Sequence, residues 1–211
     1  ARDYVEFPSQ ILERWLATIG RDILLARREG GLVLERYDPG TRRTVWKSRT
    51  FAFDARMSGA GSDPFAPGVR LSIGDDESVA VVEPGAKDGQ GRFTLVSAVS
   101  GRVLIDAKIA AERSLADCYL LPERDRYLLV LTRPPSAGAE PVPTQPMPGM
   151  PYKPIANGLV YCFDRQGQSL WPAPVPIENQ HMLVDQPAEL PVLVFACLTY
   201  RRAVNDGGQF S

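Results

Sequence analysis

The chain has 211 residues, and 44% of them are hydrophobic, which is enough for one sizeable core. Its 24 basic and 25 acidic residues give a net charge of −1, so charge offers no case for binding nucleic acid or an acidic membrane surface. No apolar run approaches the roughly 18 residues of a membrane-spanning helix, so no transmembrane segment is predicted. Nineteen prolines and eighteen glycines indicate a loop-rich, mainly β chain.

Residues 1–20 differ from everything after them. Pro8 and Ser9 are suited to the first turn of a helix, and Gly20 is suited to its end. Between them, apolar side chains recur at helical spacing. These residues are Ile11, Leu12, Trp15, Leu16 and Ile19. The pattern predicts a short N-terminal amphipathic helix that packs on a β body formed by residues 22–211.

Two four-stranded units are expected next. Residues 22–50 read as three strands, with a hairpin at Gly30-Gly31, and the first strand of this unit would come from upstream. After a loop at 54–68, the second unit has all four strands. They are Arg70–Ile73, Val79–Glu83, Arg92–Val96 and Arg102–Ile109. Asp75 and Asp76, at a turn between the first two, offer adjacent carboxylates, but solvation at a hairpin tip is the simpler interpretation.

The third unit contains a long interruption. Its first two strands are predicted at Cys118–Leu121 and Tyr127–Thr132, and a Pro-rich loop then occupies 133–157. Gly158–Trp171 reads as a strand, a tight turn and a second strand. A fourth, incomplete unit is predicted from strands at His181–Val184 and Pro191–Tyr200.

One strand-turn-strand form recurs three times. Asp38, Ser97 and Asp164 each precede a short polar turn, and Trp46, Ile105 and Trp171 close the following strand, 59 and 66 positions apart. An Asp or Ser there can accept backbone N–H bonds, Gly101 and Gly167 permit positive φ, and the closing residue can cover a seam between sheets. The recurrence favours a repeat array such as a propeller over three unrelated hairpins of an all-β domain.

At these residues the chain resembles the quinoprotein-type β-propeller family with PQQ-like repeats, over about 22–198. The family repeat reads apolar-Ala-Leu-Asp-x-x-Thr-Gly-Lys-x-Leu-Trp. Here Arg42 stands where Gly is expected, and Ser97 and Ile105 replace Asp and Trp. The resemblance implies a mainly β fold, a partial β-propeller of about three and a half four-stranded antiparallel blades, and an extracytoplasmic or periplasmic location. A chain that begins and ends within a blade is expected to be a fragment of a longer protein.

The same family contains both enzymes and scaffolds. Its dehydrogenases use pyrroloquinoline quinone, a calcium ion, a catalytic Asp, a Trp platform and often a vicinal disulfide. This chain has no adjacent cysteine pair, and no Asp is marked by a family motif, so no cofactor is predicted. Cys118, Cys162 and Cys197 are expected as free thiols, buried in the case of Cys162 and Cys197. The family also includes non-catalytic scaffolds, such as the lipoprotein of the outer-membrane assembly machine.

Residues 1–16 separately resemble a segment of thimet-oligopeptidase-like zinc metallopeptidases. In that family the Glu that matches Glu6 is the third zinc ligand, and it follows a His-Glu-x-x-His helix. That motif is absent, and the only histidine is His181. Since a catalytic zinc needs three protein ligands, zinc is expected only under this alternative.

The sequence therefore predicts a non-catalytic propeller-type scaffold or protein-interaction module, with a protein partner bound through blade loops. The alternatives are a remnant of a zinc metallopeptidase or of a quinoprotein dehydrogenase.

Overall fold

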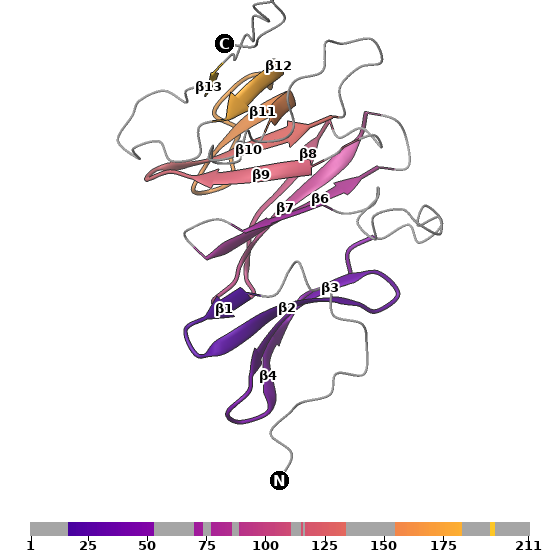
Figure 1. Ribbon diagram of the computed structural model, residues 1–211, viewed down its shortest axis with the longest axis vertical. Coiled ribbons are helices and arrows are strands. Elements are labelled where there is room, and N and C mark those ends of the chain that lie inside the picture. Colours follow the sequence, from indigo (N-terminus) through magenta and orange to yellow (C-terminus); the bar gives the residue numbers. More distant parts are fainter. Residues whose placement is uncertain are drawn as a thin grey trace, which may run out of the picture.

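The computed structural model describes residues 17–52, 70–73, 77–85, 89–110, 115, 117–133, 155–182 and 195–196. Every regular element in this part of the chain is a strand, and the strands form three antiparallel sheets. The sheets are stacked in chain order along the long axis of the molecule (Figure 1). None of the described residues forms a helix long and apolar enough to cross a membrane.

The first sheet has the order β1-β2-β3-β4. Its strands are β1 (Ala17–Ile19), β2 (Asp22–Arg28), β3 (Leu32–Asp38) and β4 (Arg43–Lys47). The predicted helix therefore does not extend to residue 20, and the first strand does not come from upstream of the chain. Gly20 has φ +62°, which lets the chain turn tightly so that Ile19 pairs with Asp22. The rest of the predicted helix lies outside the described residues.

The second sheet has the order β5-β6-β7-β8, as predicted. Its strands are β5 (Arg70–Ile73), β6 (Ser78–Pro84), β7 (Gly91–Ser97) and β8 (Val103–Ile109). Successive side chains of a strand point to opposite faces. Val82 and Phe93 thus face one neighbouring sheet, whereas Val81 and Val96 face the other, and all four are at most 1% exposed.

The third sheet has five strands, in the order β13-β12-β11-β10-β9. They are β9 (Asp117–Pro122), β10 (Arg126–Thr132), β11 (Ile155–Asp164), β12 (Val175–Met182) and β13 (Phe195–Ala196). The assignment of His181–Val184 and Pro191–Tyr200 to a fourth unit is wrong in the described residues. His181 and Met182 end β12, and the described part of the second segment, β13, pairs with them in the third sheet.

The segment Gly158–Trp171, predicted as strand, turn and strand, also differs from its expected form. After the turn, Ser169 and Leu170 pair with β11, but the chain then bends over Trp171–Pro174 before β12 begins. Pro172 and Pro174 have no N–H to donate to a ladder, so they interrupt the strand. Pairing resumes where Val175 meets Val160.

Two apolar seams hold the stack together. The first seam lies between the first and second sheets and contains Leu24, Leu34, Val81 and Val96. The second seam lies between the second and third sheets, where the Phe93 and Phe163 rings meet at 5.3 Å. The inner strands of the middle sheet, β6 and β7, thus bury apolar side chains on both faces. Successive antiparallel sheets of four or five strands, packed face to face, are the blades of a partial propeller, which confirms the predicted fold class.

The connections lie at two opposite rims. The β3–β4, β7–β8 and β11–β12 turns carry the three repeated sequences, and we call their rim the turn rim. The opposite rim, which we call the loop rim, carries the β2–β3 and β6–β7 hairpins. It also carries the end of β10 and the start of β11, which flank residues 134–154. Contacts across the second seam show that the rims of neighbouring blades lie on the same side. At the turn rim, Gly167 approaches Ile105 near the start of β8, and at the loop rim the Tyr161 hydroxyl bonds to Ala110, just after the end of β8.

Candidate functional site

The three repeated turns share a hydrogen-bond pattern. Asp38 Oδ1 accepts the backbone N–H groups of Gly40 and Thr41 at 2.8 and 3.2 Å. Asp164 Oδ1 accepts those of Gln166 and Gln168 at 2.9 and 2.8 Å. The Thr41 hydroxyl donates to Asp38 as well, and these bonds hold the pKa of the Asp38 carboxyl below its usual range.

The second turn does the same with a weaker acceptor. Ser97 Oγ accepts the N–H of Ser100 at 3.2 Å, and the Gly101 N–H closes the turn on the Ser97 carbonyl at 2.8 Å. Each of these side chains thus serves its own turn, and the three turns belong to three different sheets. The repeated residues do not converge on one common site.

The same position of each turn takes a left-handed backbone. Gly101 has φ +71° and Gly167 has φ +85°, and Arg42 has φ +57° at the equivalent place. All three stand four residues before the closing residue. The arginine therefore adopts the conformation for which the other two turns use glycine.

Two of the three closing residues lie under the turn of the next blade. A Cβ on Gly101 would lie 2.6 Å from the Trp46 ring, and the Trp46 indole N–H donates to the Ala98 carbonyl at 3.0 Å. A Cβ on Gly167 would lie 3.4 Å from Ile105. Trp46 and Ile105 therefore join blade to blade, the first much more tightly than the second. Trp171 packs against a third cluster, on the face of the third sheet away from the second seam.

The loop-rim end of the first seam is charged. The Glu83 carboxylate, at the end of β6, is nearly buried and accepts from Arg49 Nη2 at 2.6 Å and from the Ala52 N–H at 2.7 Å. Arg49 also lies 3.3 Å from Thr94 Oγ1, and its guanidinium stacks 4.2 Å over the Phe51 ring. This set, the seam cluster, ties the chain after β4 to the middle blade.

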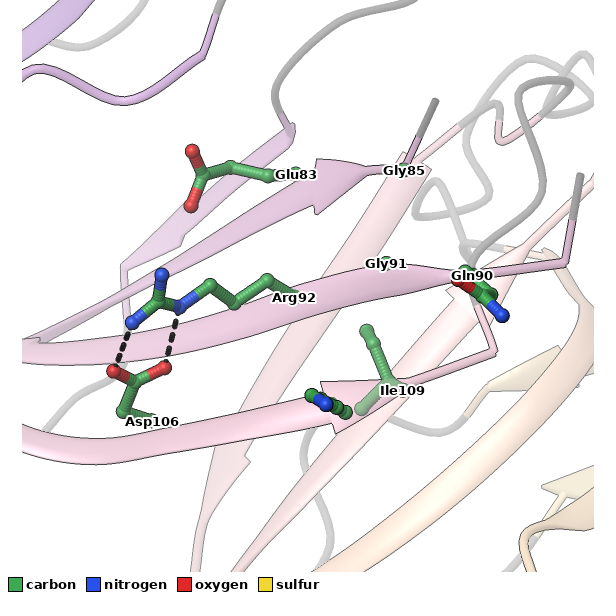
Figure 2. Close-up of a pocket in the computed structure, with 8 residues that line it drawn as sticks. Glu83, Gly85, Gln90, Gly91, Arg92, Asp106 and Ile109 are labelled. Carbon is green, nitrogen blue, oxygen red and sulfur yellow. Dashed lines mark hydrogen bonds and ion pairs between the residues drawn. The ribbon is translucent and has the colours of Figure 1, made fainter. Parts of the chain in front are cut away.

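A cavity of about 760 Å³ opens beside the seam cluster (Figure 2). The described residues that line it are Glu83, Gly85, Gln90, Gly91, Arg92, Asp106, Lys108 and Ile109. Figure 2 shows Arg92 reaching along the sheet to Asp106, with two dashed bonds between the guanidinium and the carboxylate. This paired bond holds the pKa of Asp106 below its usual range and raises that of Arg92.

The described cysteines, Cys118 and Cys162, are buried and form no disulfide. Burial raises the pKa of the Cys162 thiol, which keeps it protonated and poorly nucleophilic at neutral pH. Within the described ranges, no group of three His, Cys, Asp or Glu side chains is placed to hold a metal ion. Glu6, Asp75, Asp76 and Cys197 lie outside those ranges. The backbone of His181 belongs to β12.

The seam cluster and the cavity were not found from the sequence. The available signal was Glu83 and Arg92, which flank the β6–β7 hairpin and pair across it. Arg49 is 34 residues from Glu83 in the chain, so no local pattern connects them.

Comparison with solved structures finds the crystal structure of BamB from Moraxella catarrhalis, with a TM-score of 0.39 and 14% sequence identity. The overlap covers 78% of this chain and 35% of that one, so this chain spans about a third of the neighbour's length. No protein-family model and no curated protein sequence matches this chain. The fold assignment rests on the strand order and on the contacts between blades.

Proposed function

We propose that this chain is a non-catalytic propeller-type scaffold, a protein-interaction module that forms part of a longer protein. The observation that carries the proposal is the use of the sheet faces. The inner strands of the middle sheet, β6 and β7, bury apolar side chains on both faces: Val82 and Phe93 lie in the second seam, and Val81 and Val96 lie in the first. Sheet faces used for packing leave the turns and hairpins of the two rims for binding.

The number of blades supports the second part of the proposal. Closed propellers have four to eight blades. The described part of the chain forms three sheets, so closing a ring requires further blades. A longer protein or an assembly would provide them.

The proposal is tested by site-specific photocrosslinking of the full-length parent protein in its own organism. A crosslinker replaces Lys108 at the loop rim, Arg102 at the turn rim or, as a buried control, Val82. We expect the same discrete adduct in repeated experiments from at least one rim position and none from Val82. The proposal is overturned if neither rim position gives an adduct, or if Val82 gives the same one.

A further inference from the structure

The cavity at the loop rim has an ordered floor of charged side chains. Glu83 on β6 pairs across the sheet with Arg92 on β7, and Arg92 pairs with Lys108 on β8. Residues paired in this way lie on the same face of a sheet. The three side chains therefore form one row across three strands, and Asp106 stands two residues before Lys108 on the same face, as Figure 2 shows for its bond to Arg92.

Most of the charge in this row is already compensated. The Glu83 carboxylate is bound by Arg49 and by the Ala52 amide, and the Asp106 carboxylate is bound by Arg92 through two bonds. Lys108 is exposed, and within the part of the chain that the structure describes no group pairs with its ammonium. The compensated pairs leave one positive charge facing the cavity.

The remaining lining favours a polar ligand of limited size. Gln90 is exposed beside the row, and its side-chain amide can donate to an oxygen of a ligand. Gly85 and Gly91 put no side chains in the way. A volume of about 760 Å³ lies within the usual range of small-ligand sites and admits a few residues of peptide.

We propose that this cavity binds a single carboxylate of a partner protein, with the Lys108 ammonium as its charge partner and the Gln90 amide as a hydrogen-bond donor. The inference rests on the proposed function and names the chemistry of the partner. One negative charge matches the one cation that is uncompensated among the described lining residues. A doubly charged phosphate would face the carboxylates of Glu83 and Asp106 in the same cavity and is disfavoured. The carboxylate can belong to a chain end or to an acidic side chain.

The experiment titrates the purified full chain with short peptides and follows the backbone amide resonances of Gln90, Gly91, Lys108 and Ile109. Acetyl-Gly-Gly as the free acid represents a chain end, and acetyl-Gly-Asp-Gly-amide represents an acidic side chain. Acetyl-Gly-Gly-amide is the neutral control, and inorganic phosphate tests the competing anion. We expect saturable shifts with at least one carboxylate probe, and about tenfold weaker binding of the neutral amide, as loss of one charge-assisted hydrogen bond implies.

Two variants separate the site from general charge effects. Lys108→Gln should weaken the binding of the carboxylate probe about tenfold. Arg102→Gln, which removes an exposed cation at the turn rim, should leave this affinity unchanged. An unaltered spectrum elsewhere in the chain shows that Lys108→Gln is folded. The inference is overturned if no probe saturates, if the neutral amide or phosphate binds as tightly as the carboxylates, or if Lys108→Gln has no effect. Rim crosslinks obtained without carboxylate binding would leave the scaffold proposal standing and remove only this site.

Discussion

At the scale of single residues, one position of the repeated turn determines how closely two blades approach. Gly101 and Gly167 have positive φ, and each lies over the closing residue of the preceding blade. At Gly101 the Trp46 ring leaves no room for a side chain. The glycine is therefore required twice, once for its backbone conformation and once for the contact.

Gly101→Ala should lower the free energy of unfolding by about 3 kcal/mol, the sum of a left-handed backbone cost of about 1–2 kcal/mol and overpacking against Trp46. Gly30→Ala is the matched control, because Gly30 has φ +65° but no atom within 4 Å of an added Cβ. It should cost only about 1–2 kcal/mol. Urea denaturation of the two variants measures the difference, and equal losses would contradict the contact with Trp46.

Arg42→Gly should stabilise the protein. Arg42 is exposed and has φ +57°, a conformation that costs a residue with a Cβ about 1–2 kcal/mol. Glycine removes this cost but loses more backbone entropy on folding, so a net gain of about 0.5–1 kcal/mol remains. Thermal unfolding should show a higher Tm, and a lower one would mean that the arginine side chain contributes more than its backbone costs.

Tyr161 makes stability depend on alkaline pH. Burial raises the pKa of its hydroxyl above the usual value of about 10, although the bond from the Ala110 amide opposes this. Since the fold disfavours the ionised form, the contribution of the Tyr161 hydroxyl to the free energy of unfolding is complete below pH 10 and declines as the pH rises above that value. Tyr161→Phe should cost about 1 kcal/mol at pH 7. The difference in free energy of unfolding between this variant and the unaltered protein, measured by denaturation from pH 8 to 11.5, should become smaller as the pH rises. A constant difference would contradict the raised pKa of Tyr161.

At the scale of elements, the first seam has two different ends. Its turn-rim end is closed by Trp46 and by Arg36, whose guanidinium donates to the Val99 carbonyl of the next blade. Its loop-rim end is held by the seam cluster of Arg49, Glu83 and Thr94. The apolar side chains of a seam determine the distance between two sheets, whereas the directional hydrogen bonds at its two ends determine the orientation of one sheet on the next.

Arg49→Gln should cost about 2 kcal/mol, because it leaves the nearly buried Glu83 carboxylate without its charged partner. Glu83→Gln should cost less, since Arg49 is partly exposed and can be solvated. The double variant should lose less than the sum of the two, which a double-mutant cycle by urea denaturation measures. Strict additivity would show that the two side chains do not interact.

At the scale of the whole molecule, the blades form a stack in which the middle one contacts both neighbours (Figure 1). The two seams are separate clusters on opposite faces of that blade. Stability in such an array is a sum of the blades and of their nearest-neighbour interfaces. Damage to one seam should therefore remain local.

Hydrogen exchange tests this independence. Trp46→Leu should speed amide exchange about tenfold in β1–β4 with a small effect in β9–β12, because the first seam is weakened. Phe163→Leu should show the reverse, since Phe163 lies in the second seam against Phe93. Both variants are followed by hydrogen–deuterium exchange with mass spectrometry. Equal acceleration throughout the described strands would show that the three blades unfold as one unit.

What could be read from the sequence is what local interactions decide. The β6–β7 and β7–β8 hairpins follow from apolar strands and short polar turns, and the Asp38 and Asp164 side chains bond to backbone groups two to four residues away. The prediction of a fourth unit was wrong because Pro172 and Pro174 delay the next strand of the third sheet, β12, to Val175–Met182. The expected helix failed at Ala17–Ile19 because pairing with β2 and burial of Ile19 outweigh its helical spacing.

The sequence by itself determined the strand–turn–strand repeat, since each turn is made by residues adjacent in the chain. Only the tertiary structure decided what the repeated residues contact. Trp46 reaches Ala98 across 52 residues, and Arg49 reaches Glu83 across 34. Among the described residues, Lys108 has no partner and lies beside two compensated acids. A charge balance of this kind depends on which sheets face one another, and no local pattern records it.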